Sequence, residues 1–439
     1  MSPATYPPRR LMGADVDLTA RCPARLVSPH ATSDAPDVLP GEEIERIVEL
    51  ARHRLKMELC YIVEFTADGL MFRWMDGDQA AFGVQPGLTV ALSDADRRRL
   101  PTKRLSRAGA REPSDDPLLL ELCKLSKAYI GGYVSVPLVY SGGMRFGTLC
   151  CVSEGPRSLD SSDMAFLGIL ADLLMHHLDH HRRHDALSRQ IAHVIAGAEL
   201  PIVLQPIVDL QNWTCRGAEA LSRFPALMGA PDEVFREARA SGVDVALESL
   251  AARSALTLAP RMRPDQYLSI NMSPSVVRQA AAAVFGPEDR SLEQVVLEIT
   301  ENDSVEDYPK LAAALEPLRE RGLRVAIDDA GAGYSSLRHV VELRPDIIKI
   351  DRLLVHGMAH DAAKRSIGRS FVQLAADTGA FVIAEGIDNR DDLSTARDIG
   401  VTAGQGFLLG EPTADPDRIG LYELWSLDRF PLVGEGAES

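Results

Sequence analysis

Several acidic and amide residues of this 439-residue chain stand at the ends of short apolar runs. The run "VAIDDAGAGYSSL" closes its apolar part with two adjacent aspartates, Asp328 and Asp329. Two neighbouring anions that lose hydration need a cationic partner, so we expect a compensating charge nearby. Other apolar runs end in the same way, in Glu219, Asn271, Glu298 with Glu301, Lys349 with Asp351, Glu385 and Gln405.

The segments that must position these residues alternate between two kinds of pattern. From residue 200 onward, apolar runs of strand character are separated by helical stretches, which predicts a parallel sheet. The number of repeats favours an α/β fold closed into a TIM-like (β/α)8 barrel. In such a barrel the polar residues at the carboxyl ends of the strands converge on one mouth, and chemistry takes place there.

The converging residues are mainly anionic, and this composition predicts a metal site. Five carboxylates in one pocket repel one another unless a counter-charge is present, and hard oxygen ligands suit Mg²⁺ or Mn²⁺. Two ions about 3.5–4 Å apart would distribute the ligands, with Asp328 bridging or flanking both. Such a pair activates water and stabilises the oxygens of an in-line phosphoryl displacement. The carboxylates concerned are Glu219, Glu298, Asp328, Asp329 and Glu385.

The chain before residue 200 has a different pattern. Residues 1–40 are rich in proline and small polar residues, which predicts a disordered arm. Residues 41–178 mix helical and strand-like runs, which predicts a small α+β module with one mostly antiparallel sheet. The remaining boundaries that we expect are a helical linker over 179–198, the barrel over 199–430 and a flexible tail over 431–439.

One long helix is predicted from Ser161 to about Gly197. Its apolar stripe predicts that the helix pairs with its copy in a homodimer. Histidines with i,i+4 spacing on the same helix could bind a metal, but a solvent-exposed polar face is the interpretation we favour. The stripe consists of Met164, Leu167, Leu170, Leu174 and Leu178, and the histidines are His176, His177, His180, His181 and His184.

Composition limits the location and the partners that we expect. The net charge of −16 disfavours a general DNA or RNA surface. No run approaches the roughly 20 apolar residues of a membrane span, and no apolar signal core opens the chain, so we expect a cytoplasmic protein without a membrane partner. The six cysteines show no CxxC spacing and are expected to be reduced thiols. Cys150 and Cys151 could sense redox state or bind a cofactor, although small core residues are favoured.

The segment "AYIGGYVSVPLVYSGGMRFGTLCCVSEGPRSLDSSDMAFLGILADLL" resembles the second half of a GAF domain. The resemblance covers residues 43 to about 178. Members of that family bind cyclic nucleotides, haem, bilins or nothing. The resemblance therefore implies an N-terminal sensor module, with an unidentified small molecule as the ligand it would take.

A second resemblance is carried by seven motifs in order: "EALSRF", "NMS", "EITEN", "DDAGAGYSSL", "PDIIKID", "AEGID" and "QGFLLGEP". This series is similar to that of EAL-domain cyclic di-GMP phosphodiesterases and spans residues 200 to about 426. It implies a cyclic-guanylate-specific phosphodiesterase that hydrolyses cyclic di-GMP to linear pGpG with Mg²⁺ or Mn²⁺. We expect a homodimer that the N-terminal module regulates.

The resemblance also implies roles for individual residues. Lys349 matches the lysine that orients or polarises the attacking water, Glu385 is a candidate general base, and Glu301 matches the glutamate that fixes the loop after Asp329. Gln205 and Arg223 match positions that contact the nucleotide or its phosphate, and Gln405 matches the pocket floor. The implied metal ligands are Glu219, Asn271, Glu298, Asp328, Asp329 and Glu385.

Departures from the family pattern leave an alternative open. Ala330 and Ala332 replace the usual Phe and Thr of "DDFGTGYSSL", and Asp388 replaces a usual Glu. A catalytically weak or inactive domain would then act as a cyclic di-GMP receptor or a protein-interaction module. We favour an active enzyme, because all the implied metal ligands remain.

Overall fold

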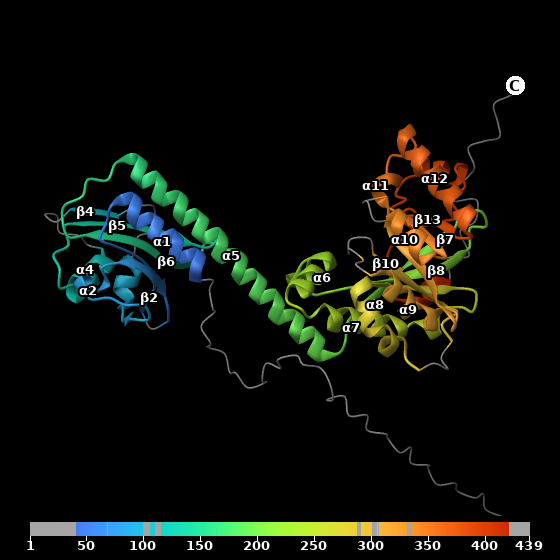
Figure 1. Cartoon of the computed structure of the whole chain (residues 1–439), viewed down its shortest axis with the longest axis horizontal. Coiled ribbons are helices and arrows are strands. Elements are labelled where there is room, and N and C mark those ends of the chain that lie inside the picture. Colours follow the sequence, from blue (N-terminus) through green and yellow to red (C-terminus); the bar gives the residue numbers. More distant parts are fainter. Residues whose placement is uncertain are drawn as a thin grey trace, which may run out of the picture. The chain divides into compact units, whose positions relative to one another are not determined.

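The structure is a computed structural model, and it describes residues 41–420 apart from 68, 100–105, 110–115, 288–290, 301–304, 306 and 332–335. The predicted arm (1–40) and tail (431–439) lie outside the described residues. The described chain forms two compact units that divide after Asp179 (Figure 1). Within this part of the chain, no helix combines the length and the apolar character that crossing a bilayer requires.

The first unit is built on one six-stranded sheet in the order β3-β2-β1-β6-β5-β4. Every neighbouring pair is antiparallel, which confirms the predicted α+β module. The central strands β1 and β6 are almost wholly buried, because helices cover both faces of the sheet. The strands are β1 Leu59–Phe65, β2 Leu70–Gly77, β3 Thr89–Val90, β4 Ser106–Gly109, β5 Gly132–Val139 and β6 Arg145–Ser153.

Each face of this sheet carries its own apolar layer. Helices α1 (Gly41–Leu55) and α5 (Ser161–Gly197) cover one face, where Val48 and Leu174 pack with Ile62. Helices α2 (Gln79–Phe82) and α4 (Pro117–Leu125) cover the other face, where Phe82 and Leu122 pack with Tyr61 and its neighbours. The short helix α3 spans Asp94–Arg99.

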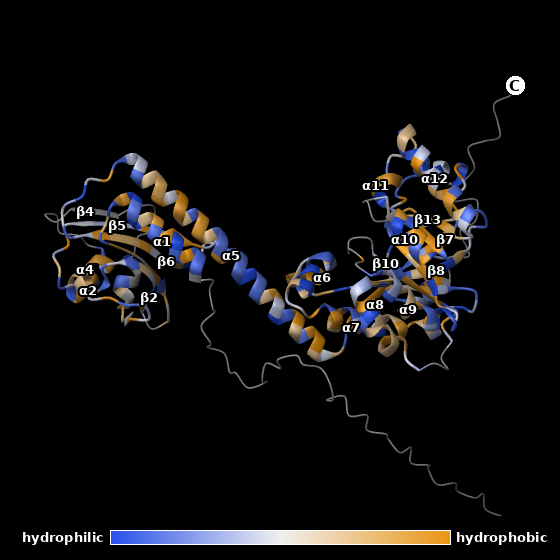
Figure 2. Ribbon diagram, viewed as in Figure 1, coloured by the Kyte–Doolittle hydropathy of each residue, from blue (hydrophilic) through white to orange (hydrophobic). Residues whose placement is uncertain are grey.

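Helix α5 has the predicted bounds, but its apolar stripe has another role. Leu167, Leu170, Leu174 and Leu178 are buried against the sheet of the first unit, so they cannot form the predicted seam with a second copy. The part of α5 that belongs to the second unit is also packed, because Ile191 lies in an apolar cluster of that unit with Val234 and Leu247. Figure 2 shows a hydrophilic stretch between the two apolar ends.

The histidines of α5 lie in that hydrophilic stretch and make ordinary polar contacts. His177 Nε2 lies 3.2 Å from Glu43 Oε2, and His184 Nδ1 lies 2.6 Å from Glu237 Oε2. In the described part of the chain, none of these histidines belongs to a group of three or more side chains arranged to hold a metal. The contacts of His177 and His184 with carboxylates are those of a polar helix face.

The second unit is a closed eight-stranded barrel, as predicted, in the order β10-β11-β12-β13-β14-β7-β8-β9. One detail differs from a (β/α)8 barrel, because β7 runs antiparallel to both its neighbours. The cause is local: a tight hairpin rather than a helix joins β7 to β8. The strands are β7 Ile202–Asp209, β8 Cys215–Ser222, β9 Tyr267–Met272, β10 Val295–Ile299, β11 Arg324–Ala330, β12 Ile347–Ile350, β13 Phe381–Ala384 and β14 Ala403–Gly404.

Helices surround the barrel and bury the outward faces of its strands in one large core. Several begin with a side chain that caps free N–H groups, such as Asp361 before α12 and Asn389 before α13. The helices are α6 Pro231–Ala240, α7 Asp244–Leu256, α8 Pro274–Phe285, α9 Tyr308–Arg319, α10 Ser336–Leu343, α11 Arg352–Val355, α12 Ala362–Thr378, α13 Arg390–Asp398 and α14 Pro416–Gly420, with short 3-10 turns at Ala226–Met228 and Ala259–Arg261.

Asp392 fastens the chain after α11 to helix α13. It is 1% exposed, and its carboxylate accepts hydrogen bonds from Gly357 N at 2.8 Å, Ala359 N at 3.0 Å and Asn389 Nδ2 at 2.7 Å. Burial opposes ionisation, but these donors, led by Ala359 and Gly357, hold the pKa of Asp392 below its usual value.

We expect Asp392→Asn to lower the free energy of unfolding by about 1–3 kcal/mol at neutral pH, because Gly357 N and Ala359 N donate to different carboxylate oxygens and an NH2 group would replace one of these acceptors. A lowered native pKa stabilises the fold above the unfolded pKa of about 3.9, and this stabilisation is lost as the pH falls through the native value. Denaturant unfolding at several pH values should therefore show the difference from wild type shrinking below about pH 4. The exposed neighbour Asp391, changed to Asn, is the matched control; an equal loss in both variants would contradict the argument.

Candidate active site

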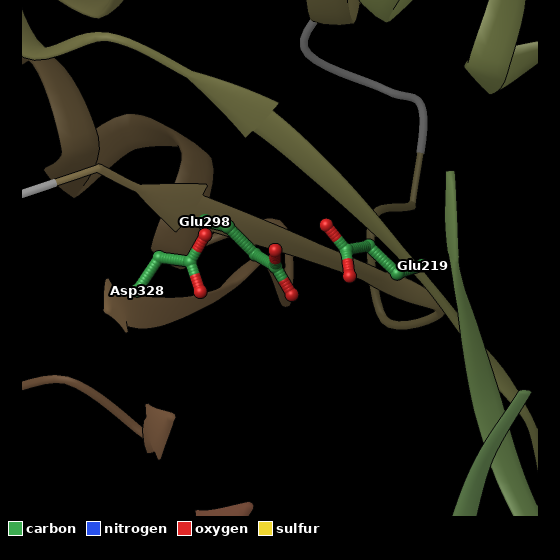
Figure 3. A group of neighbouring side chains, drawn as sticks. All are labelled: Glu219, Glu298 and Asp328. Carbon is green, nitrogen blue, oxygen red and sulfur yellow. The ribbon is translucent and has the colours of Figure 1, made fainter. Parts of the chain in front are cut away.

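The barrel interior is layered because strand residues alternate between its two faces. An apolar layer contains Val296, Ala326, Ile347, Ile383 and Ala403. Two residues further along each strand, toward the carboxyl end, the same inward face carries a polar group. This second layer holds Glu298, Asp328, Lys349, Glu385 and Gln405, joined by Glu219 of β8 and Asn271 of β9. The predicted convergence at one mouth is thus present, and Figure 3 shows the Glu219, Glu298 and Asp328 side chains gathered there.

Lys349 lies at the centre of this layer. Its side chain is 0% exposed, and Nζ lies 2.6 Å from Glu385 Oε1, 2.8 Å from Glu298 Oε2 and 2.8 Å from Asp328 Oδ1. A fourth carboxylate, Glu219, lies 3.5 Å away through Oε2. An ammonium group therefore supplies part of the counter-charge that the sequence led us to assign wholly to metal ions.

Asp328 and Asp329 both reach the mouth, although consecutive strand residues normally point to opposite faces. The pairing of β11 with β12 shifts register between Ile327 and Ala330, and Asp329 has a φ of 54°. This left-handed conformation is uncommon for residues other than glycine, but aspartate is among those that tolerate it. The resulting bulge brings one ligand atom each of Asp328, Asp329 and Glu385 to within 4.8 Å of one another.

Hydrogen bonds fix the other members of the layer. Asn271 Nδ2 donates to Glu219 Oε1 at 2.7 Å, and Gln405 Nε2 donates to Glu219 Oε2 at 2.7 Å and to Gln205 Oε1 at 3.0 Å. Ser269, a buried residue of β9, donates from Oγ to Glu298 Oε1. Sequence reasoning missed Ser269; its position two residues before Asn271 was the available signal.

Charge in this buried layer shifts several pKa values. Burial, Glu219 and Asp328 raise the pKa of Glu298, although Lys349 acts in the opposite direction. Burial and Asp328 raise the pKa of Asp329 to about 7. Burial disfavours the charged form of Lys349, but the surrounding carboxylates, Asp328 and Glu219 foremost, outweigh it and raise its pKa well above the usual value. Anionic charge is therefore in excess, even with the lysine present.

This donor set fits a divalent cation. Two groups of three carboxylates each have ligand atoms within 4.8 Å: Glu219, Glu298 and Asp328, and Asp328, Asp329 and Glu385. Asp328 belongs to both. Asn271 Oδ1 and Gln405 Oε1 are buried oxygens that accept no hydrogen bond from the described residues, which is costly unless a ligand completes them. Hard oxygen donors of this kind suit Mg²⁺ or Mn²⁺.

Arg223, assigned to the substrate from the sequence, lies outside the hydrogen-bond network of the carboxylate cluster in the described part of the chain. Arg223 is half-buried after the end of β8, where its Nη1 donates to the carbonyl of Ser222 at 2.9 Å. Glu301 and Ala332 lie outside the described residues. Asp351 caps α11 by accepting from Leu353 N at 2.7 Å, and its side chain also interacts with Asp329, whose pKa it helps to raise.

The closed α/β barrel, with a carboxylate cluster at the carboxyl ends of its strands, places the protein among barrel proteins whose site lies at the barrel mouth. Comparison with known families then shows to which family of such barrels the chain belongs. Residues 184–412 match the family model of the EAL domain, and residues 40–178 match that of the GAF domain. The chain belongs to the EAL domain family and carries an N-terminal GAF domain.

Individual relatives agree with this assignment. The probable cyclic di-GMP phosphodiesterase PdeB of Escherichia coli is 30% identical over 250 residues, covering 54% of this chain and 46% of the relative. The cyclic di-GMP phosphodiesterase PA2567 of Pseudomonas aeruginosa is 29% identical over 222 residues, covering 48% and 38%. The chain thus spans less than half the length of these two relatives. The structure of the EAL enzyme Bd1971 bound to cAMP and cyclic di-GMP is similar in fold, with a TM-score of 0.50. The match is 20% identical in sequence and covers 83% of this chain and 93% of the Bd1971 chain.

Proposed function

We propose that this protein hydrolyses cyclic di-GMP to linear pGpG with the help of Mg²⁺ or Mn²⁺. The observation that carries the proposal is the buried cluster at the barrel mouth. There, two sets of three carboxylate residues have Asp328 in common, and the ammonium of Lys349 lies 2.8 Å from Asp328. The names of the relatives PdeB and PA2567 support the choice of substrate.

Three roles in the reaction are assigned to residues of this chain: holding the cations, orienting the attacking water and accepting its proton. Glu219, Asn271, Glu298, Asp328, Asp329 and Glu385 would hold two divalent cations, which supply an acidified water and stabilise the phosphoryl oxygens. Lys349 Nζ, already within hydrogen-bond distance of three carboxylates, orients the attacking water and favours negative charge developing beside it. Glu385 is the candidate to accept a proton from that water.

The substrate side of the site uses neutral and cationic donors. Gln205 and Gln405 form a hydrogen-bonded pair at the pocket floor, and their amides are suited to a nucleotide. Arg223, which has no acidic partner among its described contacts, is suited to a phosphate. Glu301 is proposed to hold the loop after Asp329.

The proposal is tested by product analysis after incubating the full chain with cyclic di-GMP and Mg²⁺, Mn²⁺ or a chelator. We expect pGpG with either ion and none with the chelator. Glu219→Ala should lower turnover by at least about 100-fold, because it removes a ligand and the partner of Asn271 and Gln405. Glu316→Ala, an exposed carboxylate of α9, is the matched control. Equal turnover in the two variants would refute the assignment.

The alternative of a receptor that binds without cleaving would give tight nucleotide binding and no pGpG in the same experiment. The structure offers a reason why Ala330 need not impair the site. Ala330 is wholly buried in the barrel core, and a Cβ added to the neighbouring Gly331 would meet Leu354 and Phe371, so these side chains occupy the space beside the bulge. The presence of both carboxylate groups supports the enzyme over the receptor.

We also propose that the GAF domain regulates the barrel of a homodimer in the cytoplasm, through helix α5. Within the second unit α5 packs through Ile191 on α6, and Phe235 of α6 meets Phe224, which follows Arg223. A displacement of α5 would therefore be felt next to a proposed phosphate contact. Ile191→Ala should change turnover in the full chain several-fold without changing pGpG as the product; unchanged kinetics would exclude this route. Sedimentation analysis tests the dimer.

A further inference from the structure

Two thiols face each other in the sheet of the GAF domain. Cys60 of β1 and Cys151 of β6 occupy directly opposite positions in the antiparallel register. Their Sγ atoms are 2.9 Å apart, and both residues are 0% exposed. The adjacent Cys150 points to the other face, where its Sγ lies 3.6 Å from Tyr133 Oη. The sheet thus holds one close cysteine pair and one unpaired, equally buried thiol on the same strand.

The geometry of the pair suits a disulfide. Opposite residues of antiparallel strands have Cα atoms about 4.5–5.5 Å apart, which lies within the range of about 4.4–6.8 Å that disulfides span. The two sulfurs are also closer than the roughly 3.5–4.0 Å at which even smaller non-bonded carbon atoms make optimal contact. Closing the bond requires the sulfurs to approach from 2.9 Å to the roughly 2.05 Å of an S–S bond.

We propose that Cys60 and Cys151 form a reversible oxidation site, closed to a disulfide by a hydroperoxide. One thiolate attacks the peroxide O–O bond and becomes a sulfenic acid, while the leaving oxygen takes a proton. The second thiol then displaces the sulfenic oxygen as water, and the S–S bond forms. With hydrogen peroxide the balance is two thiols and one peroxide giving one disulfide and two waters.

The surroundings of the pair make this reaction slow and conditional. Burial, together with the hydrogen bond to Cys151 and the charge of that residue, raises the pKa of Cys60. Because the thiolate is the reactive form, the pair is expected to stay reduced until an oxidant is abundant. Disulfides of proteins in reducing compartments are usually of this transient kind, formed only in the presence of an oxidant.

The bridge would form beneath the helix that leaves the module. Cys60 and Cys151 belong to the same apolar layer as Leu170 and Leu174 of α5 and Val48 of α1. A covalent link between residues 91 positions apart restricts the unfolded chain strongly. Oxidation is therefore expected to stabilise the sheet face on which α5 packs.

The experiment exposes the full chain to hydrogen peroxide, blocks free thiols with an alkylating reagent under denaturing conditions, and maps peptides by mass spectrometry without reductant. We expect a Cys60–Cys151 linked peptide in the wild type and in Cys150→Ser, lost on adding dithiothreitol. The midpoint temperature of the thermal unfolding transition of the GAF domain should rise by at least about 5 °C on oxidation in both proteins. In Cys151→Ser the linked peptide and the rise should both be absent.

The wild-type peptide map decides the question even if a variant folds poorly. Cys60 and Cys151 recovered as alkylated thiols, under peroxide that fully oxidises the exposed Cys123, would overturn the proposal. So would fragment ions of the linked peptide that place the bridge at Cys150, because they would show that the register does not select the partner.

Discussion

Replacing Lys349 by methionine is expected to lower kcat/KM for cyclic di-GMP by at least about 1000-fold. The same replacement is expected to destabilise the fold in metal-free buffer. The reason is electrostatic. Lys349 is wholly buried, and four carboxylate groups lie within 3.5 Å of its Nζ. Removing one partner from a buried ion pair leaves uncompensated charge and typically costs about 3–5 kcal/mol.

Added Mn²⁺ should distinguish the two roles of this lysine. If divalent cations bind the same carboxylates, Mn²⁺ will recover much of the lost stability of Lys349→Met, as measured by thermal or denaturant unfolding. It should not recover turnover, because the ammonium that orients water is missing. Lys310→Met is the control, since Lys310 pairs with Asp307 at the surface, where an ion pair contributes little. Turnover within tenfold of wild type would show that Lys349 is not part of the catalytic machinery.

The second large effect is expected at Asp328, the only described residue that belongs to both carboxylate groups. Asp328→Asn should lower turnover by about 1000-fold or more, and it should weaken Mn²⁺ binding at both proposed positions. The variant also removes an anion 2.8 Å from Lys349 Nζ. Calorimetric titration with Mn²⁺ measures the number of ions bound and their affinities.

Asp329→Asn provides the matched comparison for Asp328→Asn. Asparagine tolerates the left-handed backbone at this position, so the bulge is expected to persist. Only the group with Asp328 and Glu385 loses a carboxylate, and the group with Glu219 and Glu298 stays complete. We therefore expect one Mn²⁺ to bind with near wild-type affinity. Identical titration curves for the two variants would contradict the sharing of Asp328.

Much of the site could be predicted because, in a barrel of this kind, the position of a residue along its strand determines the layer of the barrel interior in which it lies. Residues that end successive apolar runs, such as Glu298, Asp328 and Lys349, share one inward-facing layer, so their convergence followed from alternation alone. The central place of Lys349 could not be predicted, because spacing along a strand does not say how far a four-carbon side chain reaches between neighbouring strands.

The errors have equally local causes. The stripe from Leu167 to Leu178 has the spacing of a helix seam, but the same spacing serves for packing on a sheet, and the sheet of the GAF domain covers it. The reversed direction of β7 was missed because a short hairpin follows it, where the repeating pattern led us to expect a helix. Ser269 was missed because its hydroxyl acts through Glu298 rather than at the end of a strand.

The bulge at Asp329 gives a general rule for reading adjacent acidic residues at the end of a buried strand. On a regular strand one of the two carboxylates would have to enter the apolar layer between the barrel and its helices. A sequence that keeps both acids must therefore break the regular pleat. Deleting one residue from the pair would remove the extra residue of the bulge, so we expect Ala330 to keep its pairing with Ile350 while the site loses one carboxylate.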